Sequence, residues 1–283
     1  MKHLFKNHRT EKTKEQKENL LKLARNKLPH ISYSELKNWC QCPFYHKLVN
    51  IDKIKVFEGN EYTAFGTALH SVCEDLLTEE VELSENELFV QKFREEIKKL
   101  KTEELDKKLI ISMFQQGEKL SEKAIPALEE YFGEYEVVRA EEKLYEPIDD
   151  FEDYLFKGYI DLVIKTGDQY HIIDWKTCSW GWDARKKADK MIVYQLILYK
   201  HFFCEKYNID PKNVHTHFAL LKRTSKKNIV ELFEVTSGSK RTDNALELMY
   251  KAIKTIKSGV HMKNKLSCTA GYGCEFYKTK HCN

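Results

Sequence analysis

The hydrophobic and polar positions divide the chain into a first part with helical periodicity and a second part in which strand patterns predominate. Residues 62–78 repeat apolar side chains at the helical period and carry His70 and Glu74. Residues 84–135 continue with charged helical patterning. We therefore expect a helical lobe over about residues 62–135, ahead of the main sheet.

Strand patterns begin near Val137 and become clearest in the segment FKGYIDLVIKTGDQYHIIDWKT, where two β-rich runs flank a Gly-containing turn. Helical and strand patterns then alternate. They comprise a helix around residues 184–207, strands at 215–222 and 229–235, and a helix around 240–258. This alternation predicts a mixed α/β fold in which helices flank a central sheet.

The length of 283 residues, with 42% hydrophobic and 12% aromatic residues, allows one elaborated domain or two closely packed lobes. A structured domain is expected from Ile31, where the composition becomes apolar. Residues 1–30 carry nine Lys or Arg against three Glu, a net charge of +6 in a chain of net charge +3. This basic N-terminal arm could contact nucleic-acid backbone, and it is equally consistent with a solvated helix.

No segment has the length and apolarity of a membrane span, and the first residues lack the apolar stretch of a signal peptide. We therefore expect a cytoplasmic protein with no membrane partner. Thiols stay reduced in that compartment, so the eight cysteines are expected to be free or to bind metal.

The clearest hairpin places two acidic residues opposite each other. A two-residue type II′ turn at residues 167–168 pairs Thr166 with Gln169, and counting back along both strands brings Asp161 opposite Asp174 on one face. Opposed residues have Cβ atoms roughly 4.5–5.5 Å apart.

Two carboxylates at that separation, flanked by apolar residues, repel each other and are costly to desolvate. Mg²⁺ or Mn²⁺ would relieve the repulsion, and Lys176 lies two residues beyond Asp174, on the same face. A metal to activate water and a cation to orient it or neutralise charge are what phosphodiester hydrolysis needs. The alternative is a surface hairpin with ordinary solvated ion pairs.

Asp161, twelve intervening residues and then Asp174-Trp175-Lys176 resemble the motif of the PD-(D/E)XK nuclease superfamily. The surrounding sequence resembles the RecB-type branch of this superfamily, which includes phage and bacterial recombination exonucleases and CRISPR-associated adaptation nucleases. The resemblance covers residues 31–283. It implies a restriction-endonuclease-like core at about 136–260, preceded by the helical lobe and followed by a Cys-bearing tail at 261–283.

Further motifs lie in the order that the resemblance implies. FGTALH is similar to the Gly-x-x-x-His helix of the family, which makes His70 a third metal ligand; the alternative is a hydrogen-bonded core histidine. QLILY is similar to the Gln-x-x-x-Tyr motif, in which Gln195 and Tyr199 share a helix face and hydrogen-bond a phosphate or its nucleophilic water. The alternative is a buried pair with local partners.

Two acidic residues could support the site. Glu74 lies one turn after His70 and could orient it, although a surface charge fits the position better. The family often carries an acidic residue on the strand before the catalytic hairpin, at the position of Glu141 or Glu142 here. Adjacent strand residues face opposite ways, so only one can point into the site, and we favour Glu141.

Several members of this branch hold a four-iron cluster with one cysteine before the core and three at the C-terminus. The corresponding residues here are Cys42, favoured over Cys40, with Cys268, Cys274 and Cys282. The tail departs from the tighter family spacing, so Zn²⁺ or free thiols remain alternatives.

The resemblance implies a metal-dependent DNA exonuclease acting in recombination, repair or end processing, with DNA as partner and a helicase or recombination protein as a possible second partner. An endonuclease of restriction type is one alternative. A DNA-binding or assembly subunit that keeps the fold without cleavage is the other.

Overall fold

The computed structural model of the chain describes residues 28–55, 57–78, 81–101, 105–271 and 273–282. Almost all of the predicted basic N-terminal arm, residues 1–27, therefore lies outside the described residues. None of the described helices combines the length and the apolar composition of a membrane span.

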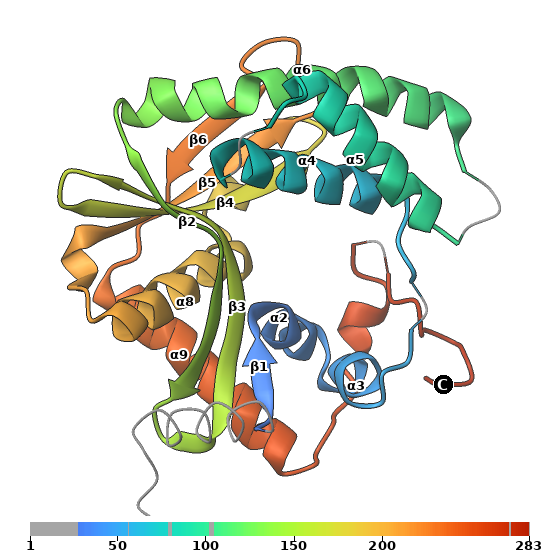
Figure 1. Cartoon of the computed structure of the whole chain (residues 1–283). Helices are drawn as coiled ribbons and strands as arrows, with labels where there is room; N and C mark the ends of the chain where they lie inside the picture. The colour runs from blue at the N-terminus through green and yellow to red at the C-terminus, as the bar shows by residue number, and fades with distance from the viewer. Residues whose placement is uncertain (1–27, 56, 79–80, 102–104, 272, 283) are drawn as a thin grey trace, which may run out of the picture.

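The described strands form one mixed sheet, shown in Figure 1. Its path runs β1-β3-β4-β5-β6, and β2 pairs with β3. The pairs β1/β3 and β4/β5 are parallel, whereas β2/β3, β3/β4 and β5/β6 are antiparallel. The strand bounds are β1 His30–Ser32, β2 Glu136–Ile148, β3 Phe151–Thr166, β4 Gln169–Cys178, β5 Val214–Lys222 and β6 Val230–Glu234. The predicted mixed α/β fold is thus confirmed.

Strand β3 is long enough to pair with two strands along one edge. Along this edge, β3 pairs with β1 at Leu155–Lys157 and with β4 at Leu162–Thr166. Along its opposite edge, β3 pairs with β2 over nearly its whole length. Residues 158–161 lie between these two stretches and pair with neither β1 nor β4. The sheet therefore separates locally at Asp161.

The predicted hairpin register is confirmed. Thr166 pairs with Gln169, and the ladder continues to Leu162 and Ile173. Gly167 has φ +56°, as the first central position of a type II′ turn requires.

Helices cover both faces of the sheet (Figure 1). On one face, Phe65 of α4 joins a core with Ile173 and Trp175 of β4; on the other, Phe202 of α8 joins a core with Ile172 of β4. The helices of the first face are α4 Glu61–Thr78, α5 Glu85–Lys99 and α6 Lys107–Phe132; those of the second include α2 Tyr33–Gln41, α8 Lys190–Tyr207 and α9 Ser239–Lys257. The helices α4, α5 and α6 thus pack directly on the sheet.

Close packing fixes the first of these layers. A Cβ on Gly117 of α6 would lie 1.9 Å from the Phe89 ring of α5, so only glycine lets the two helices approach this closely. Helix α6 also runs through Pro126 without ending. The helix predicted around residues 184–207 is divided, because Asp189 accepts a hydrogen bond from Met191 N and caps a new helix.

The C-terminal tail returns to the beginning of the described chain, and Figure 1 shows it beside α3. Phe44 N donates to Met262 O at 3.1 Å, and the Tyr45 hydroxyl donates to Glu275 at 2.9 Å. Phe276 is buried. The remaining short helices are α3 Pro43–His46, a π-helical turn Lys47–Ile51, α7 Ala184–Lys187, and 3₁₀ turns Pro211–Asn213 and Lys265–Cys268.

Candidate metal and catalytic site

Asp161 lies where β3 and β4 separate. The ladder between the strands stops at Leu162 and Ile173, one residue before Asp161 and Asp174 would form the next pair. In place of a backbone partner, the Asp161 carboxylate accepts a hydrogen bond from Trp175 N at 2.8 Å. The two acidic residues thus meet at the divergence of the strands, and not as a regular ladder pair.

Asp174 is buried between an amide and an ammonium group. Gln195 Nε2 donates to its Oδ1 at 2.8 Å, and Lys176 Nζ lies 2.5 Å from its Oδ2. Burial alone would lower the pKa of Lys176, but the carboxylates of Asp174 and Asp161 outweigh burial and raise it. Lys176 is therefore protonated and positively charged in the site.

Asp161 resists ionisation. Burial, followed by the negative charge of Asp174, raises its pKa to about 8. The sequence predicted that the two carboxylates lie close together. In the structure, the negative charge of Asp174 disfavours ionisation of Asp161. A divalent cation would reverse this effect, because it favours the ionised form of both groups.

His70 approaches from α4, on the first face of the sheet. Its Nδ1 lies 3.5 Å from Asp161 Oδ2. Burial lowers the pKa of His70 to about 4, so the imidazole is neutral near pH 7. A neutral imidazole is the form that binds metal.

Gln195 and Tyr199 approach from α8, on the second face. Besides its bond to Asp174, Gln195 Nε2 donates to the Tyr199 hydroxyl at 3.2 Å, so the two side chains act together. Burial raises the pKa of Tyr199, which keeps the phenol protonated. The two side chains therefore lie together on one face of α8.

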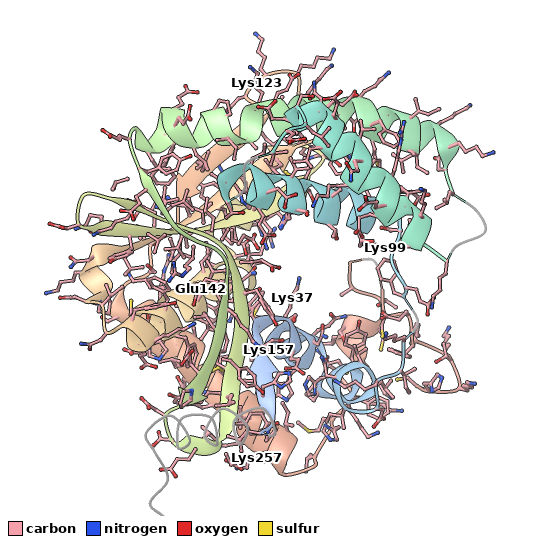
Figure 2. The ribbon with its side chains drawn as sticks, viewed as in Figure 1. Lys37, Lys99, Lys123, Glu142, Lys157 and Lys257 are labelled. Carbon is pink, nitrogen blue, oxygen red and sulfur yellow. The ribbon has the colours of Figure 1, made fainter. Side chains whose placement is uncertain are left out.

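Of the two glutamates considered on β2, Glu141 is the one beside the site. It has φ +49°, lines the same cavity as Asp161 and contributes to the raised pKa of that residue. Glu142 instead accepts hydrogen bonds from Lys206 and Tyr207 of α8, and Figure 2 labels it on that side of the ribbon. The two glutamates therefore lie on different sides of β2.

Two cavities lie beside the site, one lined by Asp161 and the other by Gln195 and Tyr199. The larger, of about 690 Å³, lies against α4, and we call it the catalytic cavity. Its lining includes Tyr62, His70, Glu74, Glu141, Asp161 and Trp175. A second cavity of about 360 Å³ lies against α2, and its lining includes Lys157, Tyr159, Gln195 and Tyr199.

The donor set suits a hard divalent cation. Two carboxylates and a neutral imidazole, contributed by Asp161, Asp174 and His70, are the ligand types that Mg²⁺ or Mn²⁺ accept. Within the described part of the chain, no three His, Cys, Asp or Glu side chains converge on one ion position. Asp174 is engaged by Lys176 and Gln195 instead.

Gly158 is a site residue that the sequence reasoning missed. A Cβ at this position would lie 2.7 Å from Tyr199 Cε1, so glycine lets the phenol lie against β3. Glycine inside a strand marks such close approaches, and FKGYID contained that signal.

The four cysteines considered for a cluster share one cavity. It has a volume of about 260 Å³ and lies between α3 and the tail. Asn264 N donates to Cys42 Sγ at 3.2 Å, and Cys274 N donates to Cys268 O at 3.0 Å. The cavity is lined by Cys42, Cys268, Cys274 and Cys282, whereas Cys40 packs against the core of the second face.

Comparison with known proteins assigns this architecture to a family. The family model described as PD-(D/E)XK nuclease superfamily matches residues 30–279. The chain is similar in fold to the crystal structure of a "putative exonuclease" from Eubacterium rectale, with a TM-score of 0.54, 13% identity and 91% of each chain covered. The crystal structure of SSO0001, at 13% identity, covers 76% of this chain and 94% of its own, with a TM-score of 0.34. No curated protein matches the chain significantly.

Proposed function

The chain belongs to the PD-(D/E)XK nuclease superfamily, and from this premise we propose that it is a Mg²⁺- or Mn²⁺-dependent nuclease that hydrolyses DNA. The observation that carries the proposal is the meeting of Asp161, Asp174 and Lys176 where β3 and β4 separate. The raised pKa of Asp161 supports it, because perturbed carboxyl pairs are typical of metal and catalytic sites.

Asp161, Asp174 and His70 would hold the ion. When bound, it supplies a lowered pKa for the attacking water and polarisation of the phosphate. Lys176 orients that water or neutralises charge developing on the phosphate. Tyr199 donates its hydroxyl hydrogen to a phosphate oxygen or to the water, and Gln195, whose two Nε2 hydrogens bond Asp174 and Tyr199, holds the phenol in place. Gly158 lets Tyr199 lie close enough to do so.

Glu141 and Glu74 line the catalytic cavity beside these ligands. We assign them supporting roles, in which their negative charge helps to attract the cation and orient His70.

We infer that the enzyme acts on DNA ends, as an exonuclease in recombination, repair or end processing, with a helicase or recombination protein as a partner. The structural similarity to a protein named as a putative exonuclease supports a shared fold. The attack on DNA ends is inferred by analogy with that fold.

Hydrolysis of end-labelled linear DNA by purified protein with Mg²⁺ or Mn²⁺ tests the proposal. We expect nucleotides to be released by the natural chain and not by Lys176→Ala. Equal release by the variant would refute the assigned role of Lys176. Discrete cuts in circular DNA would favour a restriction-type endonuclease, and DNA binding without any hydrolysis would favour the non-cleaving subunit.

We also propose that Cys42, Cys268, Cys274 and Cys282 ligate a four-iron cluster that joins the chain ends. Their common cavity supports the proposal. Anaerobically purified protein should be brown and contain about four iron atoms per chain. Zinc in place of iron would favour a zinc site, and a metal-free sample would leave free thiols. Cys42→Ala should lower the iron content, whereas Cys40→Ala, a matched control, should not.

A further inference from the structure

A second basic region lies beyond the catalytic cavity, between α6 and the turn that joins β5 to β6. It borders a cavity of about 560 Å³. One of its lining cations, Lys222, is paired with Glu231 at 3.0 Å, and its lining acid, Glu122, accepts a hydrogen bond from Asn86. The other cations that line the cavity are Lys119, Lys123, Arg223 and Lys226. We call the part of the cavity that these four residues line the basic pocket.

The cations of the basic pocket keep their positive charge for an external anion. Lys119, Lys123 and Lys226 are exposed, and Figure 2 shows Lys123 extending outward from α6. Among the described residues, no carboxylate forms an ion pair with these lysines or with Arg223. Unpaired, converging cations are the usual recognition element for a phosphate backbone.

Arg223 is held in place by neutral groups. Its guanidinium donates to Gln116 Oε1 at 2.8 Å and to Ser179 Oγ at 3.3 Å. Those bonds orient the planar group without neutralising it, and a guanidinium has further N–H groups that can bind a phosphate.

Arg223 also connects the basic pocket with the catalytic cavity. Its guanidinium carbon lies 5.2 Å from the ring centroid of Tyr62, which is 51% exposed and lines the catalytic cavity with Asp161. Arg223 N donates to Cys178 O at 2.8 Å, so Arg223 lies beside the end of the strand that carries Asp174. The two cavities are therefore neighbours along one surface.

We propose that the basic pocket binds phosphates of the same DNA strand whose scissile phosphate occupies the catalytic cavity. Arg223 binds a phosphate as the strand leaves the catalytic cavity, and the lysines bind those that follow. The exposed Tyr62 ring stacks on an unpaired base between them, so this segment of the substrate is single-stranded. This inference rests on the proposed nuclease function and adds a substrate path to it.

Binding of fluorescent oligothymidylate to the full chain in Ca²⁺ tests the path. Replacing Lys119, Lys123 and Lys226 with Ala should weaken binding of an oligonucleotide of about 20 nucleotides by at least about tenfold at low salt. The slope of log affinity against log salt should fall by about 0.7 for each lost phosphate contact.

The matched control replaces three exposed lysines elsewhere, Lys212, Lys240 and Lys254, with Ala and so changes the net charge equally. It should bind like the natural chain. Tyr62→Ala should weaken binding more than Tyr62→Phe, which keeps the ring. Arg223→Lys should bind more tightly than Arg223→Ala, and circular dichroism should confirm that each variant is folded.

Binding by the Lys119, Lys123 and Lys226 variant that matches the control in affinity and salt slope would overturn the path. If the natural chain still hydrolyses DNA, the proposed function survives that result. If the natural chain neither binds nor hydrolyses DNA, both proposals fail.

Discussion

The Asp161 carboxylate accepts a hydrogen bond from the backbone N–H of Trp175, at the point where β3 and β4 stop pairing. A side chain thus replaces a strand as the hydrogen-bond acceptor. This exchange holds Asp161 at the edge of β3, within electrostatic reach of both Asp174 and Lys176. The local opening of the sheet is therefore what brings the charged groups together.

Replacing Asp161 with Asn should stabilise the metal-free protein, increasingly as pH rises from about 4 to 8. The pKa of Asp161 is raised from 3.8 to about 8. Between these values the unfolded chain loses a proton that the folded chain keeps, so folding becomes less favourable as pH rises. With allowance for partial exposure, the gain above pH 8 should be about 1–2 kcal/mol in urea unfolding. A gain independent of pH would contradict this account.

Affinity for Mn²⁺ should rise with pH up to about 8, the pKa of Asp161, and level off above it. Below that pH the ion must displace one proton, so affinity should change by about tenfold per pH unit. Calorimetry in buffers of different ionisation enthalpy would measure the proton release. The shift of the Asp161 pKa from 3.8 to about 8 sets this window. An affinity that stays constant over the upper part of it, from roughly pH 6 to about pH 8, would mean that Asp161 is not a ligand.

Gly158→Ala should damage the site through Tyr199. The added Cβ would lie 2.7 Å from Tyr199 Cε1 and push the phenol away from Gln195. We expect a loss of about 1–3 kcal/mol in stability and a lower hydrolysis rate. Gly238→Ala, where nothing lies within 4 Å of the added atom, is the matched control. Equal activity of the two variants would show that the contact is unimportant.

A pair of neighbouring histidines, His217 buried and His171 half-buried, should make the protein sensitive to acid. His171 Nδ1 and His217 Nε2 lie 3.1 Å apart, and burial lowers their pKa values to about 4 and about 3. Their contribution to stability is complete above the ordinary pKa of 6.5 and is lost as pH falls toward 4.

Between pH 6.5 and pH 4, the free energy of unfolding should therefore fall less for His217→Phe than for the natural chain. The difference between the two falls should be about 2 kcal/mol. Urea unfolding across this range would measure both. Parallel pH profiles for the natural chain and His217→Phe would exclude the pair as the cause.

Local patterns predicted the parts of the site that depend on short-range geometry. The turn at residues 167–168 fixed the pairing of Thr166 with Gln169, and a spacing of four placed Gln195 beside Tyr199. These relations follow from strand and helix periodicity alone.

Relations between distant segments could not be predicted in this way. Nothing in the local sequence indicates that Arg223 would bond Gln116, 107 positions earlier. The positive φ of Glu141 and the strand separation at Asp161 likewise depend on how β3 is shared among three neighbouring strands. Tertiary packing decides such features, whatever the local propensity.

We propose that Asp161 and Asp174 jointly hold a divalent ion while Lys176 serves the reaction. Electron paramagnetic resonance of Mn²⁺ titrated into the natural chain, Asp161→Asn, Asp174→Asn and Lys176→Ala tests it most directly, with hydrolysis measured on the same samples. We predict that each aspartate variant loses at least about tenfold in Mn²⁺ affinity, whereas Lys176→Ala keeps the ion and loses hydrolysis. Unchanged Mn²⁺ binding by both aspartate variants would contradict the account.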